Sequence, residues 1–136
     1  MHITLRANEK IYLNGAVLKP DRKVSIELMN DAVFLLEAHV MRDRDATTPL
    51  RQLYYIVQLM LMAPREVAEN RTMFAQQSAA MFGVYNDRAM LDGLGKTVEL
   101  VGRNRYFEAL KVIRALLPVE DKLLGAEQAP ALAVAS

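Results

Sequence analysis

The spacing of apolar residues changes near residue 46, and this change limits the possible folds more than any other feature of the chain. Over residues 1–41, apolar and β-branched residues tend to alternate with polar ones, as Ile3 and Leu5 do around Thr4, which is typical of strands. Over residues 46–118 the apolar residues recur at helical spacing. The pattern predicts the α+β class, with a small N-terminal antiparallel β-sheet followed by a bundle of about four helices.

The pair Asn14-Gly15 is the strongest turn signal in the N-terminal part. It separates the apolar runs KIYL and AVLK. Both central residues of a type I′ turn need positive φ angles, which Asn and Gly tolerate best. A two-residue β-hairpin is therefore predicted here. The later run VFLLEAHVM is assigned to a strand, although its apolar residues would suit a short buried helix equally well.

A helix is predicted to begin at Pro49, because a threonine cap precedes a proline at the first helical position. Its polar side chains form one narrow stripe, at Arg51, Tyr55 and Gln58. Such a helix belongs in the core of the protein. The residues expected to be buried are Leu53, Ile56, Val57, Met60 and Leu61.

Three further helices are predicted. The second starts at Pro64 and the third follows Asn86-Asp87 and ends at Gly102, with a break or close packing near Gly95. The fourth is expected to stop before Pro118, and the alanine-rich residues 119–136 are expected to be a disordered tail. The buried positions expected on the second and third helices are Val67, Phe74, Met81, Phe82, Leu91, Leu94, Val98 and Val101.

Composition restricts both the architecture and the chemistry. With 136 residues, 52% of them hydrophobic, the chain has enough apolar surface for one core, so residues 1–118 are expected to be a single domain. The absence of cysteine excludes disulfides, thiolate metal sites and cysteine nucleophiles. No apolar run approaches the ~18 residues of a membrane span, and no secretory leader is evident, so a cytoplasmic protein without membrane contact is expected.

Sequence signatures of enzymes are missing. There is no glycine-rich phosphate loop, no nucleophile elbow and no pair of histidines at metal-ligand spacing. His39 lies in an apolar stretch, where a packed or surface role is favoured over a catalytic one. The run from Arg42 to Asp45 alternates in charge, which favours an exposed, self-compensating loop over a partner-recognition loop. We therefore expect no enzyme activity, no catalytic residues, no cofactor and no metal.

Basic residues gather in two islands, although the whole chain has a formal charge of only +1. Cations neutralise phosphates, and aromatic rings stack on unpaired bases, so such islands are candidates for contact with single-stranded RNA. By composition alone, ordinary solvated surface is the favoured interpretation. The candidate RNA-binding residues are Arg6, Lys10, Tyr12, Lys19, Arg22 and Lys23 in the first island, and Arg103 and Arg105 in the second.

Four blocks of the chain resemble the FlbT family of flagellin regulators from alphaproteobacteria. They are KIYLNGAVL, DRKVSIELMNDAVFLLEAHVM, DATTPLRQLYYIVQLMLM and EALKVIRALLP, in the same order as in the family. The likeness runs from about Ile3 to Pro118, and the segment between Pro64 and Gly95 carries no matching motif. Four blocks in register are far more specific than a single short motif.

The resemblance implies a post-transcriptional role. Proteins of this family are associated with the 5′ untranslated leader of flagellin mRNA, limiting its translation and promoting its decay, alongside the small regulator FlaF. An alternative is an interaction protein that binds flagellin or FlaF and affects the mRNA only indirectly. The apolar helix over residues 49–62 and the open sheet edges also favour a homo-oligomer.

Overall fold

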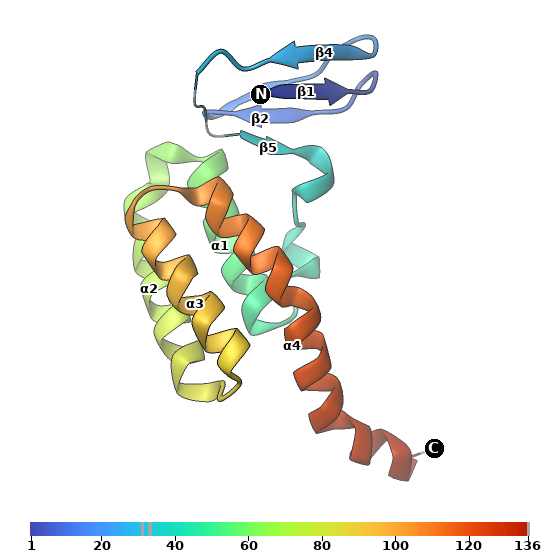
Figure 1. Ribbon diagram of the computed structural model, residues 1–136, viewed down its shortest axis with the longest axis vertical. Helices are drawn as coiled ribbons and strands as arrows, with labels where there is room; N and C mark the ends of the chain where they lie inside the picture. Colours follow the sequence, from blue (N-terminus) through green and yellow to red (C-terminus); the bar gives the residue numbers. More distant parts are fainter. Residues whose placement is uncertain (31, 33, 136) are drawn as a thin grey trace.

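The computed structural model describes the backbone of residues 1–30, 32 and 34–135 and the side chains of residues 1–30, 32 and 34–125 (Figure 1). The strands are β1 (His2–Leu5), β2 (Ile11–Leu13), β3 (Ala16–Leu18), β4 (Val24–Glu27) and β5 (Phe34–Leu36). The α-helices are α1 (Pro49–Met62), α2 (Val67–Val84), α3 (Arg88–Gly102) and α4 (Tyr106–Ala135). Three short 3₁₀ helices are η1 (Glu37–His39), η2 (Asp43–Asp45) and η3 (Pro64–Glu66). The predicted α+β class is confirmed.

The strands form two thin antiparallel sheets rather than one. β1 pairs with β4, and β2 lies between β3 and β5. Alternate residues of β5 point to opposite sides, because Phe34 belongs to an apolar cluster with Ile3 and Leu5 whereas Leu35 belongs to the helical core. The β3-β2-β5 sheet is therefore the middle of three layers, between β1-β4 and the helices (Figure 1).

The predicted hairpin is confirmed. Leu13 pairs with Ala16, so the turn contains only Asn14 and Gly15, with φ angles of 49° and 83°. Two positive φ angles are the mark of the type I′ turn, whose twist matches that of the flanking strands. The predicted strand over residues 33–41 is present as β5, which among the described residues covers Phe34–Leu36, and the chain then turns into η1.

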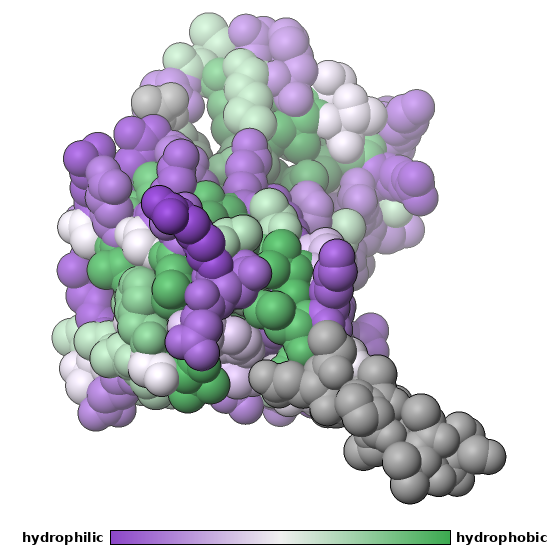
Figure 2. Space-filling model, turned by 60° about the horizontal axis from the view of Figure 1, so that its bottom comes forward, coloured by the Kyte–Doolittle hydropathy of each residue, from purple (hydrophilic) through white to green (hydrophobic). Residues whose placement is uncertain are grey.

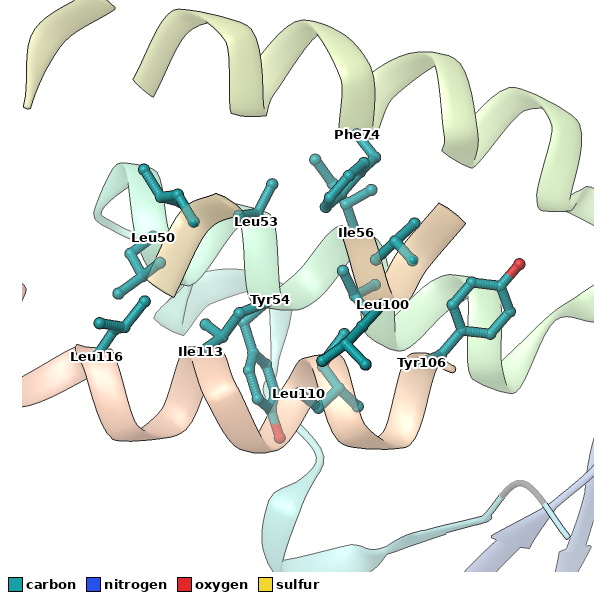
Figure 3. Close-up of a cluster of buried hydrophobic side chains, with 14 of the residues drawn as sticks. Leu50, Leu53, Tyr54, Ile56, Phe74, Leu100, Tyr106, Leu110, Ile113 and Leu116 are labelled. Carbon is teal, nitrogen blue, oxygen red and sulfur yellow. The ribbon is translucent and has the colours of Figure 1, made fainter. Parts of the chain in front are cut away.

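α1 is the central helix, and all five of its predicted core residues are buried. Its apolar side chains meet those of α4, with Phe74 of α2 on the other side (Figure 3). The prediction for Gln58 is wrong, because this side chain is also buried. Its Oε1 accepts from the N–H of Met41 at 2.6 Å, and its Nε2 donates to the carbonyl of Met41 at 2.8 Å. Gln58 thus ties the segment after η1 to the helical core.

Two predicted core residues of the later helices lie at the surface. Phe82 on α2 is 42% exposed and Val98 on α3 is 39% exposed, whereas Phe74, Met81, Leu94 and Val101 are buried as predicted. Viewed toward the helical end, green apolar side chains reach the surface between purple polar ones (Figure 2). α2 borders α1 and α3 only along part of its circumference, so its outer face stays uncovered by the described residues.

The close packing expected near Gly95 occurs at Gly93 instead. A Cβ at Gly93 would lie 2.4 Å from Cδ1 of Leu116, whereas a Cβ at Gly95 would meet nothing within 4 Å. α3 continues unbroken through both glycines and ends at Gly102 as predicted. The small residue at Gly93 lets α3 and α4 approach each other closely.

The helix end expected before Pro118 is wrong, because α4 continues through this proline. The proline has no N–H, so one helical hydrogen bond is missing there. Glu120, two residues later, is completely buried, and Val119 and Leu123 pack against the helical core. The side chains of residues 126–136 lie outside the described part, where the disordered tail stays a prediction.

The carboxylate of Glu120 is hydrogen-bonded on both oxygens. Its Oε2 accepts from the N–H of Leu50 at 2.8 Å and from the Tyr85 hydroxyl at 2.7 Å. Its Oε1 accepts from the hydroxyl of Thr48, which in turn caps α1 by accepting from the N–H of Arg51 at 3.2 Å. These contacts satisfy donors at the N-terminus of α1 that have no partner within the helix.

An ion pair lies at the edge of this network. Arg51 donates from its two terminal nitrogens to Asp121, at 2.7 and 3.0 Å. The hydrogen bond from Arg51 holds the pKa of Asp121 below its usual value. A lowered pKa in the folded state means that this pair stabilises the fold at neutral pH and that its contribution is lost as the pH falls through that pKa.

The position of α1 also changes the expectation of self-association. Its apolar side chains are used inside the chain, so this helix does not offer a surface for oligomers. The edge strand β3 remains open within the described structure, with Val17 58% and Leu18 45% exposed. No helix in the described part is long and apolar enough to cross a membrane.

Replacing Gly15 by valine should lower the free energy of unfolding by about 1 kcal/mol or more, because a β-branched residue would be forced to a positive φ. A Cβ at this position would lie 3.5 Å from the ring of Pro64, which is an ordinary contact, so backbone strain rather than a clash is the cause. Urea denaturation measures the change. Gly95→Ala is the control and should not destabilise the protein. An unchanged midpoint for Gly15→Val would contradict the turn.

Truncating Leu53 to alanine should cost about 2–5 kcal/mol of stability, because the side chain is fully buried in the helical core. Denaturation followed by circular dichroism gives the value. The control is Leu59→Ala on the same helix, where the side chain is only half-buried and the loss should be smaller. Equal losses in the free energy of unfolding for the two variants would show that burial of the leucine does not determine the loss of stability.

Glu120→Gln should destabilise the fold by about 1–3 kcal/mol, because the amide cannot accept all the hydrogen bonds that the buried carboxylate accepts. Asp121→Asn, on the neighbouring exposed carboxylate, should cost less. Urea denaturation of both variants at pH 7 tests this order. If Glu120→Gln were as stable as the unchanged protein, the hydrogen bonds of the buried carboxylate would not contribute to stability.

Candidate functional site

Two loops connect the sheets at the same end of the strands. Residues 6–10 join β1 to β2 and residues 19–23 join β3 to β4. The N–H of Asn8 in the first loop donates to the carbonyl of Pro20 in the second at 2.7 Å, so the loops touch. We call residues 6–10 and 19–23 the cationic end (Figure 1).

The cationic end brings together the five basic residues of the first predicted island, Arg6, Lys10, Lys19, Arg22 and Lys23. With Glu9 and Asp21 as its acidic residues, it has a formal charge of +3, compared with +1 for the whole chain. All five basic side chains are exposed. Positive charge is therefore concentrated here by the folding of the strands.

Most of these cations keep their charge available. Arg22 is the one with an ion pair among the described residues, to Asp21 at 3.4 Å. The carboxylate of Glu9 accepts a hydrogen bond from the backbone N–H of Arg6 at 3.0 Å. The carboxylate of Glu37 accepts one from the backbone N–H of Lys10 at 2.9 Å. These acidic side chains thus hold the loop backbone in place.

Tyr12 does not join the cationic end. It lies within β2 and packs, half-buried, against the helical core, on the face of the strand opposite Ile11 and Leu13. Its ring is therefore not presented on an open sheet face beside the five cations. The period-2 pattern of β2 indicated two faces, but it did not reveal that both faces would be covered.

The second predicted island lies at the other end of the strands. Arg103 and Arg105 belong to the connection between α3 and α4. Arg103 forms an ion pair with Glu99 at 3.0 Å, and the Nε of Arg105 donates to Glu108 at 2.7 Å. Each guanidinium is thus paired with a carboxylate, and the structure does not bring these two residues together with the first island.

An open groove of about 1010 Å³ adjoins this second island. It lies between the strand end at Met1 and Met29 and the start of α4. Lys96 and Lys111 line it. The Nζ of Lys111 lies 4.9 Å from the centre of the Phe107 ring, a contact that their four-residue spacing on a helix would have signalled.

The described residues show no arrangement for metal binding. Nowhere in the part of the chain with described side chains do three His, Asp or Glu side chains gather as ligands. Burial, followed by the charge of Arg114, lowers the pKa of His39, and burial raises the pKa of Tyr54. These two residues lie next to each other, because the Tyr54 hydroxyl donates to the carbonyl of His39 at 2.6 Å.

Comparisons with known proteins give a consistent result. The family described as "Flagellar protein FlbT" matches residues 1–124. "Probable flagellum biosynthesis repressor protein FlbT 2" of Bradyrhizobium diazoefficiens is 59% identical over 125 residues, which are 92% of this chain and 92% of that protein. "Probable flagellum biosynthesis repressor protein FlbT" of Brucella anthropi is 50% identical over 136 residues, which are 100% of this chain and 89% of that protein.

No solved structure matches the chain. The family match nevertheless covers both the strands and the four helices, so it includes the cationic end, the groove and the buried carboxylate of Glu120. The resemblance seen in the four sequence blocks is confirmed. The chain belongs to the FlbT family of flagellar proteins.

Proposed function

We propose that this protein is a post-transcriptional regulator of flagellin synthesis that binds the 5′ untranslated leader of flagellin mRNA through the cationic end. The relatives are named as probable flagellum biosynthesis repressor proteins, and these names support a regulatory role in flagellar synthesis and not an enzymatic one. The proposal of RNA contact depends on one observation. Five exposed basic side chains lie together on two loops that contact each other.

Exposed basic side chains on touching loops can contact the phosphates of an RNA strand. Lysine and arginine side chains neutralise phosphates, and the release of counterions makes such binding depend on salt. A protein seated on the leader excludes the ribosome from the start region and thereby limits translation. Decay of the message then depends on a ribonuclease of the host, because this function assigns the protein no catalytic residue.

Binding to a protein partner is the second candidate function. Met73, Phe82 and Val84 are exposed on α2, and no charged residue lies between Arg71 and Asp87. An uncharged helix face with exposed apolar side chains is typical of protein interfaces. Flagellin or FlaF would be bound there, and a homo-oligomer would form through the open edge of β3.

Exchanging Arg22 and Lys23 together for glutamate should weaken binding to the flagellin leader by about tenfold or more at low salt, because phosphate contacts become repulsive. The slope of log affinity against log salt should flatten by roughly one to two units. Filter binding across a salt series measures both. Stability should hardly change, because both side chains are exposed.

The double variant Arg88→Glu and Lys122→Glu is the matched control. It makes the same change in net charge at exposed positions on α3 and α4, away from the strands. Its RNA affinity should stay close to that of the unchanged protein. If both double variants bind the leader like the unchanged protein while binding to flagellin or FlaF is intact, the protein-partner function is the correct one.

A further inference from the structure

A small pocket lies beside the cationic end, where the chain passes from β5 to α1. It has a volume of about 280 Å³, and its walls include His39, Met41, Asp45, Tyr54, Arg114 and Leu117. The N–H of Glu37 donates to the carbonyl of Lys10 at 3.0 Å, and His39 follows two residues later in η1. The segment after β5, which contributes His39 to the pocket, therefore lies on the same side of the fold as the two cationic loops (Figure 1).

Two oppositely charged groups in this pocket have unused hydrogen-bonding capacity. Arg114 is half-buried, and most of its N–H donors remain available because its one hydrogen bond in the described structure goes to the Tyr54 hydroxyl at 3.2 Å. Asp45 lines the same pocket, and neither group has an ion-pair partner among the described residues. Arg114 is half-buried and Asp45 is exposed, so donors of the guanidinium and acceptors of the carboxylate are both open to a ligand in the pocket.

The walls of the pocket are held in place. The Tyr54 hydroxyl donates to the carbonyl of His39, and Gln58 hydrogen-bonds both the N–H and the carbonyl of Met41. The His39 ring stands in the wall, and its Nδ1 is buried with no hydrogen-bond partner in the described part. These hydrogen bonds fix the backbone of His39 and Met41 in the wall, so this part of the pocket loses little conformational entropy when a ligand binds.

The chemistry of the pocket selects among ligands. A simple anion would satisfy Arg114 but would be repelled by Asp45. A ligand that accepts hydrogen bonds on one edge and donates them on the next satisfies both side chains. The volume of about 280 Å³ lies just below the ~300–1,000 Å³ typical of small-molecule pockets, which suits one flat ring system.

We propose that this pocket binds one unpaired guanine base of the RNA, with Arg114 donating to O6 and N7 and Asp45 accepting from the N1–H and the 2-amino group. Arginine is the usual partner of these guanine acceptors, and carboxylates accept from base donors. Adenine, cytosine and uracil each lack part of this pattern. The proposal rests on the proposed function, since the cationic end would hold the flanking phosphates.

Short oligonucleotides test the pocket directly. The full chain is titrated with uridine-rich ten-nucleotide RNAs that differ at one central base, which is guanine, inosine, 7-deazaguanine or adenine. Guanine should bind about tenfold more tightly than adenine, because one good bidentate contact discriminates by about this factor or more. Inosine lacks the 2-amino group and 7-deazaguanine lacks N7, so each should lose part of the preference.

Asp45→Asn should abolish the preference for guanine over inosine while leaving the affinity for an all-uridine RNA unchanged or slightly raised. Asp43→Asn is the matched control, because it removes the same charge from the same 3₁₀ helix without touching the pocket. It should keep the preference for guanine. Both positions are exposed, so both variants should fold.

Equal affinity of the unchanged protein for the guanine and adenine RNAs would contradict guanine binding in the pocket and leave the proposed function intact. If Asp45→Asn kept the full preference for guanine over inosine, guanine binding in the pocket would also be contradicted. Failure of the unchanged protein to bind any of these RNAs, or the flagellin leader, at low salt would instead overturn both proposals.

Discussion

The buried carboxylate of Glu120 is the contact on which the arrangement of the helices depends. It connects α4 to the first turn of α1 through Thr48 and Leu50, and to the linker between α2 and α3 through Tyr85. A charge without exposure to water is tolerated only when it is paired or fully hydrogen-bonded, and here both oxygens are satisfied. Three segments that are far apart in the sequence thus meet at one side chain.

The two thin sheets are joined to the helices because both faces of β2 and β5 are covered. Ile11 and Phe34 face β1-β4, whereas Leu35 faces the helices. Phe107 at the start of α4 contacts both clusters, and its ring centre lies 4.7 Å from that of Phe34. This tilted ring pair joins the strand layers, which carry the cationic end, to the helical core.

The candidate site follows from the topology of the strands. The C-terminal ends of β1 and β3 lie on the same side of the strand layers, so the loops that follow them meet and their basic residues form one surface. The segment after β5 turns on this side too, and its residues His39 and Asp45 line the same pocket as Arg114 on α4. The five exposed cations and the small pocket lined by Asp45 and Arg114 thus lie on one side, whereas Arg103 and Arg105 lie at the other end, paired with carboxylates.

Local chemistry made the hairpin at Asn14-Gly15, the cap of α1 and its buried face predictable, because each depends on residues close together in the chain. The five cations of the first island were also predictable as a group. Burial of Gln58 and Glu120, exposure of Phe82 and the continuation of α4 past Pro118 were not. These depend on which helix lies opposite each residue, and a polar side chain is buried only where a distant segment brings it hydrogen-bond partners.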